Sequence, residues 1–218
     1  MLEVLAKIPG RSKIAYKYSE TDIAHAAVLL RGFKGELRGF KEESVVDEHT
    51  FWLDFAATNP NLSDQSDTAV YQQQILEIID RIQLHEVNKV VLSRPSHLYT
   101  ERADAQATFA ALQERYSNCT VFALKHPDFG HWMGASPEVL FEEIDGGYRS
   151  MSLAGTRLSG ALNWGDKERE EQNFVTKEIY KTLDNFGGHV RTQGEETLNA
   201  GPVEHLMTWV VTDAMTAP

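Results

Sequence analysis

A run of short strand-type segments in the middle of the chain constrains the fold more than any other feature of the sequence. The segments are 120–124, 131–134, 139–143 and 148–153. The turn Asp145-Gly146-Gly147 is typical of a tight hairpin and is expected to join the last two. Strands grouped in this way, instead of alternating one by one with helices, indicate an α+β fold.

Three longer segments carry the apolar spacing of amphipathic helices. Apolar residues recur every three to five positions along 66–87, and similar stripes run along 103–116 and 166–186. The pair Gly187-Gly188 follows the last stripe, where a left-handed cap is expected to end the helix. Further expected elements are a short helix at 22–33 and strands at 44–46, 50–54, 89–92, 190–193 and 205–212. The expected architecture is therefore α+β, with large mixed or antiparallel sheets flanked by helices.

Composition excludes several classes of function. The chain has 32 acidic and 21 basic residues, a net charge of −11 and no basic stripe, which argues against nucleic acid as a partner. No apolar run approaches the roughly 20 residues that cross a bilayer, and the first residues lack the apolar stretch of a signal peptide. The lone Cys119 cannot form an internal disulfide. We therefore expect no membrane association and a cytoplasmic location.

Lys89 is the first candidate for chemistry. On a strand over 89–92, Lys89 and Val91 share one face while Val90 and Leu92 share the other, so both faces hold apolar residues. Such a strand is expected to be central, with its lysine partly desolvated. Desolvation lowers the pKa of a lysine amine and can make it a general base. The alternative is a lysine at a strand end whose ammonium reaches solvent.

Two turns carry further candidates. Glu138 follows the Gly-Ala-Ser-Pro sequence at 134–137, where small residues and a fixed dihedral angle could hold an acid catalyst in place. The alternative is an ordinary solvated turn. Gly155 and Thr156 end an expected strand, where exposed backbone N–H groups can bind a carboxylate. A β-bulge or a plain strand end is the alternative there.

Glu171 and His205 are the remaining candidates. The apolar stripe through Val175 and Ile179, extended backwards, reaches Glu171. An inward carboxylate needs a partner, and a hard cation is one option. The alternative is a first-turn acid that complements the helix dipole or pairs with Lys167. His205 precedes an apolar strand, where a lone histidine is more often structural.

The order of these segments resembles that of the chorismate-utilising enzymes, and within them the isochorismate synthases. The segments are Lys-Val-Val-Leu-Ser-Arg at 89–94, Glu138 after Gly-Ala-Ser-Pro, Ala-Gly-Thr-Arg at 154–157, Lys-Glu-x-x-Glu-x-x-x-Val at 167–175 and His205-Leu206. The resemblance covers about 66–212 and leaves about 1–60 as a variable region. It implies one incomplete chorismate-binding domain over 1–218, in which no long linker is visible.

The resemblance implies a magnesium-dependent isomerase that converts chorismate into isochorismate. Lys89 matches the base that activates water for attack at ring carbon C2, and Glu138 matches the acid that protonates the departing C4 hydroxyl. Glu171 matches a magnesium ligand, and the ion holds the ring carboxylate. Gly155 and Thr156 match residues that line the substrate pocket. The match also implies that chorismate, the substrate, is the partner; no partner protein is indicated.

Further positions refine the resemblance. His205 matches a histidine beside the ring carboxylate and the leaving group. Relatives that use ammonia usually carry glutamine at the position of Lys89, and aminodeoxychorismate synthases carry lysine at the position of Ala154. The residues present favour water as the nucleophile. Salicylate synthases share this pair and remain the alternative enzyme, and the reaction serves menaquinone, siderophore and salicylate pathways alike.

The chain departs from the family in two respects. Gln172 stands where a histidine is common. Family members also continue for well over a hundred residues, and that region supplies a second magnesium-binding glutamate and groups that hold the pyruvyl carboxylate. We therefore expect the isolated chain to be weakly active or inactive. A non-catalytic fragment or paralogue that binds a partner or chorismate is the alternative from another class.

Overall fold

The computed structural model describes residues 1–31, 36–55, 68–96 and 104–213. The chain divides into two compact units. The first comprises Met1–Gln65 and His97–Ser136, and the second comprises Ser66–Ser96 and Pro137–Pro218. A single chorismate-binding domain over 1–218 stays a prediction.

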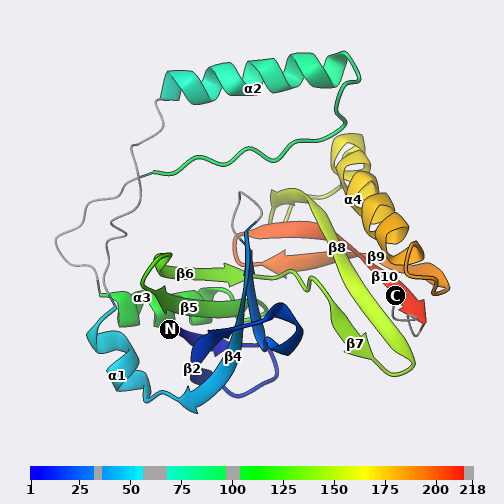
Figure 1. Cartoon of the computed structure of the whole chain (residues 1–218). Helices are drawn as coiled ribbons and strands as arrows, with labels where there is room; N and C mark the ends of the chain where they lie inside the picture. Colours follow the sequence, from blue (N-terminus) through cyan, green and yellow to red (C-terminus); the bar gives the residue numbers. More distant parts are fainter. Residues whose placement is uncertain (32–35, 56–67, 97–103, 214–218) are drawn as a thin grey trace. The chain divides into compact units, whose positions relative to one another are not determined.

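The first unit is built on a six-stranded antiparallel sheet in the order β3-β4-β2-β1-β5-β6 (Figure 1). Its strands are β1 (Leu2–Lys7), β2 (Ile14–Thr21), β3 (Val28–Arg31), β4 (Leu37–Val45), β5 (Thr120–His126) and β6 (Gly130–Ser136). Its helical elements are the 3₁₀ turn η1 (Ile23–His25), α1 (Glu48–Leu53) and α3 (Ala105–Arg115). The strands expected at 120–124 and 131–134 and the helix expected at 103–116 are confirmed within the described residues.

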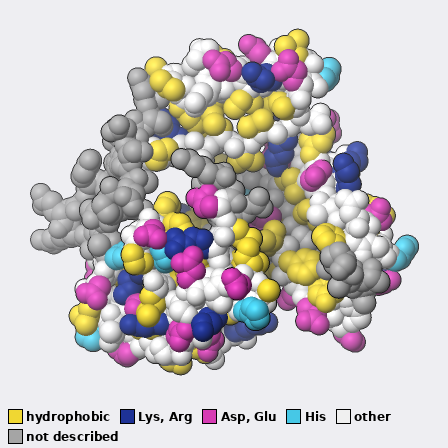
Figure 2. Space-filling model, viewed as in Figure 1, with side chains coloured by type: hydrophobic (Ala, Val, Ile, Leu, Met, Phe, Trp, Pro, Cys, Tyr) yellow, Lys and Arg dark blue, Asp and Glu magenta, His cyan; other side chains and the backbone are white. Residues whose placement is uncertain are grey.

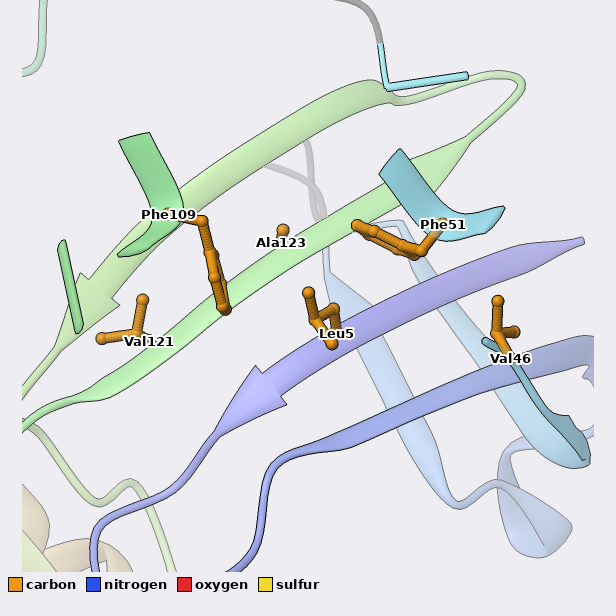
Figure 3. Close-up of a cluster of buried hydrophobic side chains, with 6 residues drawn as sticks. All are labelled: Leu5, Val46, Phe51, Phe109, Val121 and Ala123. Atoms are coloured by element: carbon orange, nitrogen blue, oxygen red, sulfur yellow. The ribbon is translucent and has the colours of Figure 1, made fainter. Parts of the chain in front are cut away.

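Side chains from two helices close one face of this sheet. Phe51 of α1 and Phe109 of α3 pack with Leu5 and Ala123, which come from neighbouring strands (Figure 3). The other members of this buried cluster are Val46 and Val121. Burial of this apolar surface stabilises the unit.

Two expectations in the first unit are wrong. The helix expected at 22–33 is η1 followed by β3, as far as the structure describes it. Val28 and Leu30 pack against the core while Leu29 is exposed, which is the period of a strand. The strand expected at 50–54 lies largely in α1, because the Asp47 carboxylate accepts a hydrogen bond from the Thr50 N–H at 2.9 Å and caps a helix.

The second unit carries a four-stranded antiparallel sheet in the order β7-β8-β10-β9. Its strands are β7 (Glu142–Ile144), β8 (Gly147–Leu158), β9 (Val190–Ala200) and β10 (Val203–Asp213), and its helices are α2 (Thr68–Gln83) and α4 (Asp166–Asp184). Helix α4 packs on the sheet through Ile179 and Leu183 against Val190 and Val210 (Figure 1). The fold is α+β, as predicted.

The expected turns of the second unit are confirmed. Gly146 has a φ of +78° in the hairpin between β7 and β8, and Gly187 has a φ of +80° after α4. Both angles lie in the left-handed region that glycine adopts without a steric cost. The segments expected at 205–212, 66–87 and 166–186 correspond to β10, α2 and α4, whereas those expected at 148–153 and 190–193 lie within β8 and β9, which are longer than predicted. Of the strand expected at 139–143, only its last two residues lie in β7.

The strand expected at 89–92 is absent. Residues 88–96 have no regular secondary structure, and none of the described strands pairs with them. Val91 is 83% exposed, and no residue of α2, which the structure describes in full, is buried. Figure 2 shows hydrophobic side chains gathered along α2. A segment of high strand propensity stays irregular when no neighbouring strand supplies hydrogen bonds. None of the described helices is long and apolar enough to span a bilayer.

Candidate active site

Two candidate residues form an ion pair. The Lys89 Nζ lies 3.2 Å from the Glu171 Oε1, and their side chains are 25% and 35% exposed. Glu171 projects from the first half of α4, whereas Lys89 lies in the irregular segment after α2. The structure thus brings together the expected base and the expected metal ligand. Glu171 has Lys89 as its ion-pair partner, and it is less buried than the sequence predicts.

Glu138 lies near this pair. It follows β6, and two hydrogen bonds hold the next residues against β8. The Met151 N–H donates to the Val139 carbonyl at 3.0 Å, and the Ser150 Oγ donates to the Leu140 carbonyl at 2.7 Å. Surrounding protein raises the pKa of the Glu138 carboxyl above its ordinary value, although the positive charge of Lys89 offsets part of the rise. A carboxyl with a raised pKa keeps its proton to higher pH, as an acid catalyst requires.

Thr156 and His205 form a second pair, on neighbouring strands. They lie opposite each other in β8 and β10, and the Thr156 Oγ1 is 3.0 Å from the His205 Nδ1. Burial lowers the pKa of His205 below its ordinary value, and a hydrogen bond to the Ala154 backbone offsets part of this. His205 is therefore held mainly as the neutral imidazole at neutral pH.

The strand bends directly before Thr156. Between the pairs His205–Thr156 and Met207–Leu153, Leu206 alone lies opposite two residues of β8, Ala154 and Gly155. This is a β-bulge, the alternative that the sequence left open. A Cβ on Gly155 would lie 2.8 Å from the Glu168 carbonyl oxygen of α4. Glycine therefore allows the helix to approach the bulge, and a role for Gly155 in lining a substrate pocket stays a prediction.

One buried residue of this region was missed as a functional candidate. Gln172 is 3% exposed and bonds to both Ser152 and Ala154 of β8. The inward stripe of α4 runs through 172, 176, 179 and 183, one position beyond the stripe that pointed to Glu171. The spacing from Gln172 through Ile179 to Leu183 was the signal that could have found it.

A groove borders Lys89. It has a volume of about 530 Å³ and lies between residues 87–91 and α4. Its walls include Asn88, Lys89, Phe174, Val175 and Glu178. The groove could admit a small polar molecule beside the lysine amine.

The donor set available for magnesium is small. In the described part of the chain, no group of three or more His, Cys, Asp or Glu side chains could hold a metal ion. Glu171 is accessible and supplies one carboxylate. Magnesium prefers oxygen ligands and usually keeps several waters, so Glu171 fits as one ligand of a hydrated ion.

Comparison with known proteins identifies the family. A model of the family described as chorismate binding enzyme matches residues 41–217. The chain belongs to the chorismate-binding enzyme family. Isochorismate synthase MenF of Escherichia coli K12 is 27% identical over 146 residues, which are 61% of this chain and 34% of MenF. The chain thus spans about a third of the curated relative it matches.

Solved structures confirm the fold. The structure of MenF, the menaquinone-specific isochorismate synthase of Escherichia coli, aligns with 100% of this chain and 66% of its own at a TM-score of 0.60 and 16% identity. DhbC of Bacillus anthracis, named as a 2,3-dihydroxybenzoate-specific isochorismate synthase, aligns with 100% of this chain and 56% of its own at a TM-score of 0.55 and 17% identity. At this identity, the likeness carries the fold alone.

Proposed function

We propose that this chain carries the acid–base half of an isochorismate synthase, an isomerase that converts chorismate into isochorismate. One observation carries the proposal. Lys89 pairs with Glu171 and lies close enough to Glu138 to influence its pKa. The residues that resemble the base, the metal ligand and the acid are thus neighbours, although they are far apart in the sequence.

The reaction forms one C–O bond and breaks another. The ion pair with Glu171 is the protonated form of Lys89, and the base is its amine form, which accepts a proton from water as the water oxygen bonds to C2 of the ring. Glu138 gives its proton to the C4 oxygen, which leaves as water while the ring double bonds shift. Lys89 ends as an ammonium and Glu138 as a carboxylate, and a proton passed back between them restores the enzyme. Because one water enters and one leaves, substrate and product are isomers.

The environment of each group suits its task. Burial raises the pKa of Glu138, so a larger share of this carboxyl is protonated near neutral pH than in water. Glu171 is the residue that would hold magnesium, and the ion would supply positive charge to the ring carboxylate of the substrate. The backbone at Gly155 would supply a hydrogen bond to the substrate, and Thr156 would line the pocket beside His205. Positioning and charge stabilisation of this kind provide much of an enzyme's rate.

Two alternatives are supported by particular observations. A salicylate synthase would use the same residues, since it forms isochorismate first and then eliminates pyruvate. A catalytically inactive binding fragment is favoured by the small set of metal donors among the described residues. No group of three or more His, Cys, Asp or Glu side chains in the described part of the chain could hold a metal ion.

A product assay separates these proposals. The purified chain is incubated with chorismate and Mg²⁺, and the products are separated by chromatography, with Lys89→Ala as the active-site variant and Arg81→Ala as an exposed control on α2. Isochorismate formed by the wild type and by Arg81→Ala, but lost in Lys89→Ala, is the expected result for a synthase. Salicylate with pyruvate would support the alternative enzyme. A folded chain that binds chorismate without product would support the binding fragment.

A further inference from the structure

A chain of hydrogen bonds links the interior of α4 to His205. The Gln172 Oε1 accepts from the Ala154 N–H at 2.9 Å. The Ala154 carbonyl accepts from the Thr156 Oγ1 at 3.1 Å, and that oxygen lies 3.0 Å from the His205 Nδ1. Four residues on three elements are therefore connected without a break.

The bulge explains why Gln172 is needed. Ala154 lies in the bulge, where the one-to-one register with β10 is interrupted within the described sheet. A buried N–H without an acceptor is costly. Gln172 supplies that acceptor, while its Nε2 donates to the Ser152 carbonyl at 2.9 Å and to the Ser152 Oγ at 3.1 Å. Both the oxygen and the nitrogen of the buried Gln172 amide therefore form hydrogen bonds to β8.

The direction of the hydrogen bonds between Ala154, Thr156 and His205 follows from the number of hydrogens that Thr156 can donate. A threonine hydroxyl has one hydrogen to donate. The Ala154 carbonyl can only accept, so we assign the Thr156 hydrogen to it, and the ring is then the donor in the contact with Thr156. The ring proton then lies on Nδ1, and Nε2 remains as an acceptor.

We propose that Gln172 is a positioning residue whose amide, through Ala154 and Thr156, fixes His205 as the tautomer with its proton on Nδ1. The same amide sets the bulge against α4 beside Glu171. This deepens the proposed function and rests on it for the roles of the contacted residues. An acceptor at Nε2 suits a hydroxyl hydrogen of the substrate and is unsuited to a carboxylate.

The following variants separate the effect of the Gln172 amide from the effect of packing between α4 and the sheet. Gln172→Met keeps the length of the side chain but removes its acceptor and its donors. Thr176→Val is the matched control, because it removes a neighbouring hydroxyl that donates to the Gln172 carbonyl at 3.0 Å and meets the Ser152 Oγ at 2.8 Å, yet keeps the Gln172 amide and its bond to Ala154. Gln172→His restores one acceptor and one donor, and histidine is common here in the resembled family. Gln172→Asn, whose amide is one methylene shorter, replaces the methionine variant if that variant does not fold.

The first measurement needs no ligand. Nuclear magnetic resonance of the whole chain at about pH 8 gives the ring ¹⁵N shifts of His205 and the hydrogen exchange of the Ala154 N–H. We expect the Nδ1–H tautomer in the wild type and in Thr176→Val. In Gln172→Met we expect a mixture of His205 tautomers and at least tenfold faster hydrogen exchange of the Ala154 N–H. In Gln172→His we expect the wild-type tautomer and the wild-type exchange rate to return. The inference is overturned by an Nε2–H tautomer in the wild type, or by equal effects of Gln172→Met and Thr176→Val.

The second measurement separates this inference from the proposed function. Calorimetry gives the dissociation constant of chorismate in the presence of Mg²⁺. We expect binding about tenfold weaker in Gln172→Met and unchanged in Thr176→Val, in line with the loss of groups that support binding residues. Unchanged affinity in Gln172→Met would overturn the positioning role and leave the function standing. A wild-type chain that binds neither chorismate nor Mg²⁺ would count against the proposed function. The tautomer of His205 measured by nuclear magnetic resonance would then decide the inference by itself.

Discussion

Two segments of the second unit share a Val-Val pair and have different structures. Residues 89–92 read Lys-Val-Val-Leu, and residues 209–212 of β10 read Trp-Val-Val-Thr. In β10, Val210 and Val211 are 0% and 1% exposed, whereas Val90 and Val91 are 43% and 83% exposed. Strand β10 pairs with β8 on one side and with β9 on the other, while 89–92 pairs with no described strand. Neighbouring strands, rather than strand propensity, decide which segment is a strand.

A charge placed in each segment should produce the largest difference. Val210→Asp buries a carboxylate without a partner, and we expect it to lower the free energy of unfolding by more than about 4 kcal/mol, enough to prevent folding. Val91→Asp should change it by less than about 0.5 kcal/mol, since the residue is exposed. Urea unfolding and the yield of folded protein measure both. A severe effect of Val91→Asp would show that 89–92 is buried in solution.

The same reasoning explains which parts of the fold could be predicted. The helical period of α4 and the glycines at 146 and 187 are local signals, and the structure confirms the helix and both turns, although the inward stripe begins at Gln172 and not at Glu171. The strand at 89–92 could not be tested locally, because pairing depends on residues distant in the sequence. The 22–33 segment was misread for a similar reason, since its two-residue period emerges only when β3 packs beside Phe40.

The sequence could predict which residues belong to the candidate site, but it could not predict which of them contact one another. The order of the motifs pointed to Lys89, Glu138 and Glu171, whose roles stay predictions. Nothing local indicated that Lys89 would pair with Glu171. Gln172 was noted only as a departure from the family, because its importance depends on a bulge in β8 that its own helix does not encode.

A pH series should sharpen the contrast between the paired strand and the irregular segment. Burial on β10 lowers the pKa of His205, so the folded chain binds fewer protons there than the unfolded chain just below the ordinary value of 6.5. The stability linked to neutral His205 is complete above that value and is lost as pH falls through the folded pKa. Between about pH 7 and about pH 5, the wild type should therefore lose more stability than His205→Gln. Parallel curves in urea unfolding at each pH would contradict burial of this ring.

The smallest effect concerns the ion pair that ties the irregular segment to α4. A double-mutant cycle with Lys89→Met and Glu171→Gln should give a coupling of about 0.5 kcal/mol, because both side chains remain partly exposed. The Arg81–Glu86 pair at 3.3 Å, whose side chains are 66% and 51% exposed, is the reference and should give less. A coupling above about 2 kcal/mol would mean that water is excluded from Lys89 and Glu171. The segment 89–94 would then be held as firmly as β10 at Lys89, and the contrast between the two Val-Val sequences would not extend to that residue.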